Sequence, residues 1–83
     1  MILITQSGDR AVNMNHIQEV FIYTEGRENK KYAVIARQNQ SGRDGWLVLG
    51  EYGMPERAKK VFDWLAYAWA AESQELNYSM PKE

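Results

Sequence analysis

The stretch Trp64-Leu65-Ala66-Tyr67-Ala68-Trp69-Ala70-Ala71 is an uncharged run inside the one long helix that the sequence predicts. A surface helix of a small domain normally has one apolar stripe and one polar face. The first half of this helix fits that pattern, since charged residues lie between positions 56 and 63, but the second half is apolar on all sides. A helix of this kind has to be covered on more than one side. A chain of 83 residues has little left to cover it, which indicates a second copy or a partner.

We expect this helix over about residues 55–73. Pro55 suits the first helical position, where its missing N–H is not needed. The helical spacing predicts one stripe that faces the core: Ala58, Val61, Phe62, Leu65 and Trp69. The side away from that stripe carries the residues that we expect to form a self-complementary interface: Trp64, Tyr67, Ala68 and Ala71. The alternative is that residues 76–80 or the sheet fold back over this side within one monomer.

The first two-thirds of the chain has the alternation and the turn residues of strands. The expected strands are Met1–Gln6, Ala11–Met14, Ile17–Thr24, Lys31–Arg37 and Trp46–Tyr52. The predicted fold class is α+β: a curved, mainly antiparallel five-stranded meander over residues 1–52, with one long C-terminal helix packed on it and an extended tail over residues 74–83. Residues 1–83 form one domain.

The sheet has the same surplus of apolar residues as the helix. Strict alternation places Trp46, Val48 and Tyr52 on one side of their strand and Leu47 and Leu49 on the other. One helix covers only one face of a sheet. Either the sheet closes into a partial barrel that shelters both faces, or the second face meets another chain.

Composition limits the classes of function. Ten Lys and Arg against eleven Asp and Glu give a net charge of −1, without the positive excess of a typical nucleic-acid binder. The longest apolar run is far below the ~20 residues of a membrane span, and Met1–Thr5 does not resemble a signal peptide. We therefore expect a cytoplasmic protein that does not bind membranes.

The chain has no cysteine and one histidine, so neither disulfides nor a thiolate metal site can support this small domain. Oligomerisation is the remaining common support for a domain of this size. Together with the apolar helix, this predicts a homodimer, or a complex with an unidentified protein partner.

Several short segments resemble a group of small, functionally uncharacterised proteins of Firmicutes-type bacteria and their prophages. The matching segments are Ile2–Gln6, Val12–Ile17, Leu49-Gly50-Glu51-Tyr52 followed by Glu56-Arg57-Ala58, and Tyr78–Pro81. The resemblance implies a strand–turn–helix unit and a phage or mobile-element accessory protein, and it brings no established activity. Members usually carry Ser or Thr at the position of Met54, where methionine cannot cap the helix, a loss of about 1 kcal/mol.

The sequence offers no catalytic, cofactor-binding or metal-binding constellation. His16 is the one candidate general base near neutral pH, but no nucleophile or partner acid forms a recognisable signature with it. The carboxylates lack the spacing of a calcium loop or a metal-binding helix. We interpret His16 as a turn histidine and expect a non-enzymatic interaction protein.

The alternative function is weak binding of single-stranded nucleic acid by a basic and aromatic β-surface. The residues proposed for it are Tyr23, Lys30, Tyr32, Arg37 and Trp46. The other interpretation is a solvated sheet edge guarded by charge. The interpretation as a solvated sheet edge is favoured, because Glu25 and Glu28 cancel much of the positive field.

Overall fold

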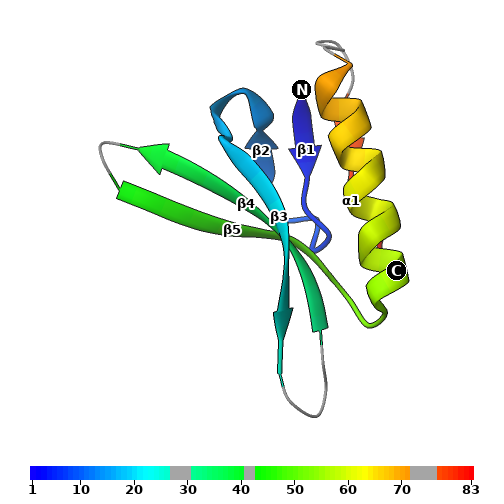
Figure 1. Ribbon diagram of the computed structural model, residues 1–83. Coiled ribbons are helices and arrows are strands. Elements are labelled where there is room, and N and C mark those ends of the chain that lie inside the picture. Colours follow the sequence, from blue (N-terminus) through cyan, green and yellow to red (C-terminus); the bar gives the residue numbers. More distant parts are fainter. Residues whose placement is uncertain (27–30, 41–42, 72–76) are drawn as a thin grey trace.

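The computed structural model describes residues 1–26, 31–40, 43–71 and 77–83. It is an α+β fold with six strands in two small sheets and one helix packed on them (Figure 1). The elements in chain order are β1 (Ile2–Ile4), β2 (Ala11–Asn13), the 3-10 helix η1 (Met14–His16), β3 (Glu19–Glu25), β4 (Lys31–Gln40), β5 (Arg43–Tyr52), α1 (Pro55–Ala70) and β6 (Asn77–Ser79).

The prediction of a single five-stranded meander is wrong. One sheet has the order β2-β1-β6 and is mixed, and the other has the order β3-β4-β5 and is antiparallel. The tail, expected only to be extended, contains β6, which pairs in parallel with β1 through Leu3 and Tyr78. A parallel partner more than seventy positions away leaves no local turn signal in the sequence. The predicted meander therefore missed both the sixth strand and the division into two sheets.

Gln6 joins the two sheets. Its backbone N–H donates to Leu49 O at 2.8 Å. Its side-chain amide then pairs with the backbone of Glu51: Nε2 donates to Glu51 O at 2.9 Å, and Oε1 accepts from Glu51 N at 2.7 Å. One amide side chain thus replaces a strand partner at the edge of β5 and satisfies backbone groups that would otherwise lack partners.

Helix α1 begins at Pro55, as predicted, after Met54, which makes no side-chain cap. It ends at Ala70 with Ala71 as C-cap, and predicted positions 72 and 73 lie outside the described residues. The predicted stripe is partly confirmed, since Ala58, Val61 and Leu65 are buried. Phe62 and Trp69 are half-buried at its sides, and Ala68 completes the buried stripe. The helix is therefore rotated slightly from the predicted orientation.

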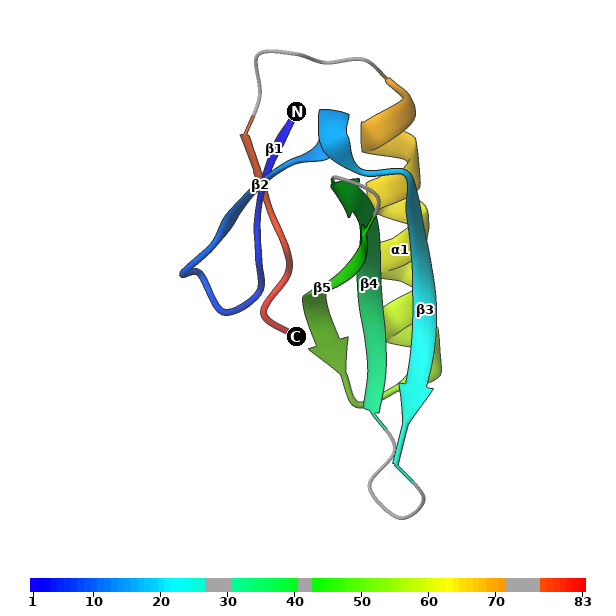
Figure 2. The same cartoon turned by 90° about the vertical axis from the view of Figure 1, so that its left-hand side faces the viewer.

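The core lies between α1, the inner face of the β3-β4-β5 sheet and the β2-β1-β6 sheet (Figures 1 and 2). Its largest fully buried side chains are Leu3, Met14, Leu49, Leu65, Val34 and Val61. Tyr52 is buried there as well and donates its hydroxyl proton to Pro81 O at 2.9 Å. Gly50 leaves room for the Tyr52 ring, because a Cβ at position 50 would lie 2.8 Å from the Tyr52 hydroxyl oxygen.

A bulge in β5 explains why Tyr52 lies on the core side, opposite to its predicted side. Val34 pairs with Gly50, but the next residue, Ile35, pairs with Val48, so Leu49 is an extra residue without a partner on β4. An inserted residue changes the side of the strand on which the following residues point. Trp46 and Val48 stay on the outer face, while Leu49 and Tyr52 both reach the core.

In the part of the chain that the structure describes, no helix is long and apolar enough to cross a membrane.

Candidate protein-binding face

Three rows of side chains form the middle of the outer face of the β3-β4-β5 sheet, between the paired positions Glu25–Lys31 at one end and Asn39–Asp44 at the other. Directly paired residues on neighbouring strands point to the same face. From one end to the other, the rows are Glu19–Arg37–Trp46, Phe21–Ile35–Val48 and Tyr23–Ala33–Glu51. We call these nine residues the outer sheet face. Helix α1 lies on the opposite side of the sheet, behind the strands in Figure 2.

Aromatic and apolar side chains form the centre of the outer sheet face. The Trp46 ring lies edge-on to Phe21, with centroids 5.1 Å apart, and to Tyr23, with centroids 6.0 Å apart. Beneath them, Ala33 and Ile35 on the central strand are buried. Trp46 is nevertheless 57% exposed, Val48 50% and Tyr23 42%. A contiguous exposed apolar patch of this kind is typical of an interaction surface.

Two ion pairs border this apolar centre. Arg37 Nε lies 3.3 Å from Glu19 Oε1, and Lys31 Nζ lies 3.6 Å from Glu51 Oε2 at the other end. Each of these two ion pairs is neutral as a pair. An apolar centre with a polar rim is the usual anatomy of a protein–protein interface.

The helix residues predicted to form an interface have separate environments. Trp64 is half-buried and packs edge-on against Tyr78, with centroids 5.8 Å apart, and Ala68 is buried. Tyr67 is 79% exposed, and Ala71 is exposed. The tail thus covers Trp64 within the monomer, as the alternative interpretation stated. Tyr67 and Ala71 are the two of the four residues that stay open to solvent.

The residues predicted for nucleic-acid binding are only partly brought together. Tyr23, Arg37 and Trp46 share the outer sheet face. Tyr32 pairs with Thr24 and Tyr52. It alternates along β4 with Ala33, which lies on the outer face, so Tyr32 points to the inner face and packs against the core. Lys30 lies outside the described residues. Lys31, Phe21 and Val48 were missing from both predicted sites, although the alternation of β3 already placed Phe21 beside Tyr23.

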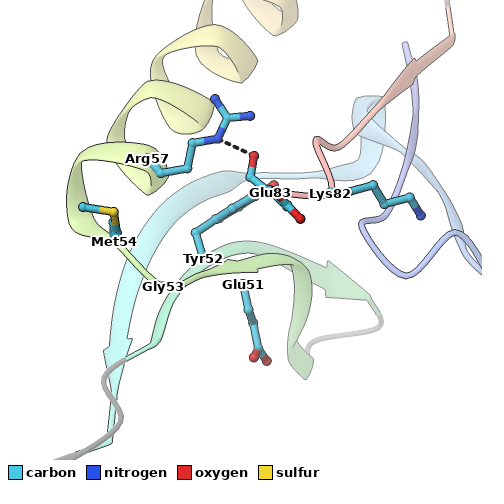
Figure 3. A pocket seen from close by; sticks show the side chains of 7 residues that line it. All are labelled: Glu51, Tyr52, Gly53, Met54, Arg57, Lys82 and Glu83. Carbon is cyan, nitrogen blue, oxygen red and sulfur yellow. Dashed lines mark hydrogen bonds between the residues drawn. The ribbon is translucent and has the colours of Figure 1, made fainter.

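A pocket of about 450 Å³ lies where β5 leads into α1 (Figure 3). It is lined by Glu51, Tyr52, Gly53, Met54, Arg57, Lys82 and Glu83. Its cations already have partners: Arg57 Nε donates to Glu83 O, and Lys82 Nζ donates to Gln6 O at 2.9 Å. Burial raises the pKa of the Tyr52 hydroxyl, so this phenol stays neutral and structural.

His16, the one candidate base, ends η1 and is exposed. It lines a shallow pocket of about 290 Å³ with Arg10, Ala11, Val12, Asn13, Gln38 and Leu47, a set without a carboxylate or a nucleophile. The other shifted group, Asp9, has its pKa lowered chiefly by a hydrogen bond from Ser7 within the β1–β2 turn. Among the described residues, no group of three His, Cys, Asp or Glu side chains is placed to hold a metal ion.

Comparisons of the chain with models of protein families, with curated proteins and with solved structures give no match.

Proposed function

We propose that this protein is a non-enzymatic interaction protein that forms a homodimer through the outer sheet face. The observation that supports this most strongly is the cluster of Trp46, Tyr23 and Val48, which are exposed side by side on one sheet. Trp, Tyr and Arg dominate the energetics of measured interfaces. The centre of this face contributes Trp46 and Tyr23, and Arg37 lies in the same row as Trp46.

The magnitudes are compatible with a moderate dimer. A Trp or Tyr side chain offers about 150–250 Å² of surface, so the exposed fractions of Trp46 and Tyr23 leave about 200 Å² uncovered. At about 25 cal/mol per Å², covering this area contributes about 5 kcal/mol per copy, part of which offsets the entropic cost of association. A standard interface buries about 800 Å² per partner, so the charged rim has to take part as well.

A second copy is the occupant that fits this rim. Its two described ion pairs, Arg37–Glu19 and Lys31–Glu51, carry both signs of charge, which a second copy of the same face can complement, whereas a partner of one strong charge would meet repulsion from one member of each pair. The domain is also small and lacks disulfides, and dimer formation would add buried surface to a marginal core. The accessory role in phages or mobile elements that the resemblance implies stays a prediction.

The test compares Trp46→Glu with Tyr67→Glu by sedimentation velocity over a range of concentrations. Both variants place a carboxylate at an exposed aromatic position, one on the sheet and one on α1. We expect Trp46→Glu to weaken the dimer by at least about a hundredfold and Tyr67→Glu to behave as the wild type. Thermal unfolding at low concentration checks that both variants fold. A wild type that sediments as a monomer at every concentration would refute the proposal, as would a dimer lost only in Tyr67→Glu.

The second candidate is the binding of single-stranded nucleic acid by the same face, because Tyr23, Arg37 and Trp46 lie on it together. Bases stack on aromatic rings without sequence preference. Glu19 and Glu51 on this face oppose phosphate binding. Titration of a labelled oligo(dT) and oligo(rU) at low ionic strength tests this candidate. Saturable binding that falls steeply with salt would favour it, and a flat titration would eliminate it.

A further inference from the structure

The rows of the outer sheet face restrict how two copies can pack. The apolar row Phe21–Ile35–Val48 lies between two rows that carry charge, and the central strand β4 carries one cation on either side of this row, Lys31 and Arg37. Most homodimers have two-fold symmetry. When two sheets pack face to face with aligned strands, the symmetry axis lies between them and runs either along the strands or across them.

Two of the possible axes bring like charges together. An axis along β4 places this strand over its own copy in the same direction, so Arg37 faces Arg37 and Lys31 faces Lys31. An axis across the strands at the level of Val34 places Arg37 over Lys31, because these residues lie three positions to either side of Val34. Facing like charges at an interface are destabilising. Both arrangements are therefore disfavoured.

An axis across the strands through the apolar row avoids this repulsion. Phe21, Ile35 and Val48 then lie over the same row of the second copy, and the row Glu19–Arg37–Trp46 lies over the row Tyr23–Ala33–Glu51. Arg37 lies over position 33, where Ala33 is small and buried and carries no charge, with Glu51 on the neighbouring strand. Neighbouring strands are only about 4.8 Å apart, so the long arginine side chain reaches that carboxylate.

The geometry points to a two-fold dimer centred on Phe21, Ile35 and Val48, in which Arg37 of each copy pairs with Glu51 of the other. This inference rests on the proposed function and specifies its partner and register. The present contacts of both groups are exchangeable, since Glu19 and Glu51 have half-exposed side chains and such surface pairs are weak. Arg37 Nε is moreover buried without a hydrogen bond despite its proximity to Glu19.

The test uses charge reversal at three positions, Arg37→Glu, Glu51→Lys and Glu19→Lys, with dimer dissociation constants from sedimentation. Reversal at position 37 or 51 creates two repulsive contacts in the homodimer, and we expect each to weaken it by roughly tenfold to a hundredfold. Glu19→Lys is the matched control. It removes the same intramolecular ion pair as Arg37→Glu, but position 19 faces Tyr23 of the second copy, so the dimer is retained within about threefold.

Mixing the variants identifies the register. An equimolar mixture of Arg37→Glu and Glu51→Lys restores two attractive contacts, and we expect a heterodimer of nearly wild-type affinity. The mixture of Arg37→Glu with Glu19→Lys should give no such recovery. Recovery only in the second mixture, or no loss of affinity in either Arg37→Glu or Glu51→Lys, would overturn the register while leaving the dimer and its dependence on Trp46 intact. Loss of the dimer in Glu19→Lys would also contradict it.

Discussion

The outer sheet face and the outer side of α1 both expose aromatic residues, but in different settings. On the sheet, Trp46 and Tyr23 lie against each other and beside Val48, over a strand whose Ile35 is buried. On the helix, Tyr67 is more exposed than either. Of its helical neighbours, Asp63 is charged, Ala70 and Ala71 are small, and Trp64 is half-buried and packs against Tyr78 instead.

The difference teaches that the exposure of one aromatic residue is a weak sign of an interface. The energy of binding concentrates where large side chains gather and exclude water together, and a lone exposed aromatic side chain is common on protein surfaces. Large side chains gather in this way on the outer sheet face and not on the outer side of α1. The following variants test the distinction, from the largest expected effect to the smallest.

Val48 and Leu49 are neighbours on β5 that lie on opposite sides of the sheet. Leu49 is fully buried, so Leu49→Ala should lower the free energy of unfolding by about 2–5 kcal/mol. Val48→Ala should cost less than about 1 kcal/mol in the monomer and should raise the dimer dissociation constant about tenfold. Urea unfolding at low concentration and sedimentation measure the two quantities. A Val48→Ala variant with unchanged dimerisation would remove Val48 from the interface.

Trp64 and Tyr67 provide the matching pair on α1. Trp64→Ala removes the packing against Tyr78, which fastens β6 to the helix, and should lower the free energy of unfolding by about 2–3 kcal/mol. Tyr67→Ala should change it by less than about 0.5 kcal/mol. Thermal and urea unfolding check both. If Tyr67→Ala weakened the dimer more than Val48→Ala does, the helix would be the binding surface.

Met54 is, beside Tyr67, another large exposed apolar residue on the helical side, and it leaves α1 without a side-chain cap. Met54→Ser supplies the missing acceptor and should raise the free energy of unfolding by about 1 kcal/mol. Met54→Ala is the control, because alanine cannot cap, and it should give no gain. Neither substitution should alter the dimer, and a weaker dimer in both would extend the interface to the start of the helix.

The buried hydroxyl of Tyr52 makes the free energy of unfolding depend on pH. Burial raises the pKa of its hydroxyl above the ordinary value of 10.0, so above that value the unfolded chain loses this proton more readily than the folded chain. The stabilisation is complete below pH 10 and is lost as the pH rises through the pKa of the folded state. Tyr52→Phe should cost about 0.5–1 kcal/mol at pH 7 by losing the hydrogen bond to Pro81. The difference from the wild type should shrink above pH 10. Urea unfolding at pH 7, 9 and 11 measures it, and a constant difference would contradict the assignment.

Local patterns predicted the elements better than their assembly. The helical spacing of Ala58, Val61 and Leu65 predicted α1 and its buried side, since both follow from neighbours on one element. The pairing of β6 with β1, and the Gln6 amide on β5, join distant parts of the chain and leave no periodic signal. The predictions therefore failed at the division into sheets, where only tertiary contacts decide.

For the candidate site, too, local patterns predicted part of the arrangement and tertiary contacts decided the rest. The sequence showed that the sheet has apolar residues on both faces, and the structure assigns each residue to its face. Strict alternation placed Tyr52 with Trp46 and Val48, but Leu49, which has no partner on β4, moves Tyr52 into the core. The sequence alone also could not show that the tail packs against Trp64, because Tyr78 reaches Trp64 only through the pairing of β6 with β1.

The absence of cysteine from the sequence allows the most direct test of the outer sheet face. Val48→Cys introduces one thiol at the centre of this face, and Ala66→Cys introduces one on the exposed side of α1. Each variant is treated with a short bifunctional maleimide at a concentration at which the wild type is dimeric, and the products are separated on a denaturing gel. We predict a covalent dimer for Val48→Cys and a monomer for Ala66→Cys. Efficient cross-linking of Ala66→Cys, with none of Val48→Cys, would contradict the account.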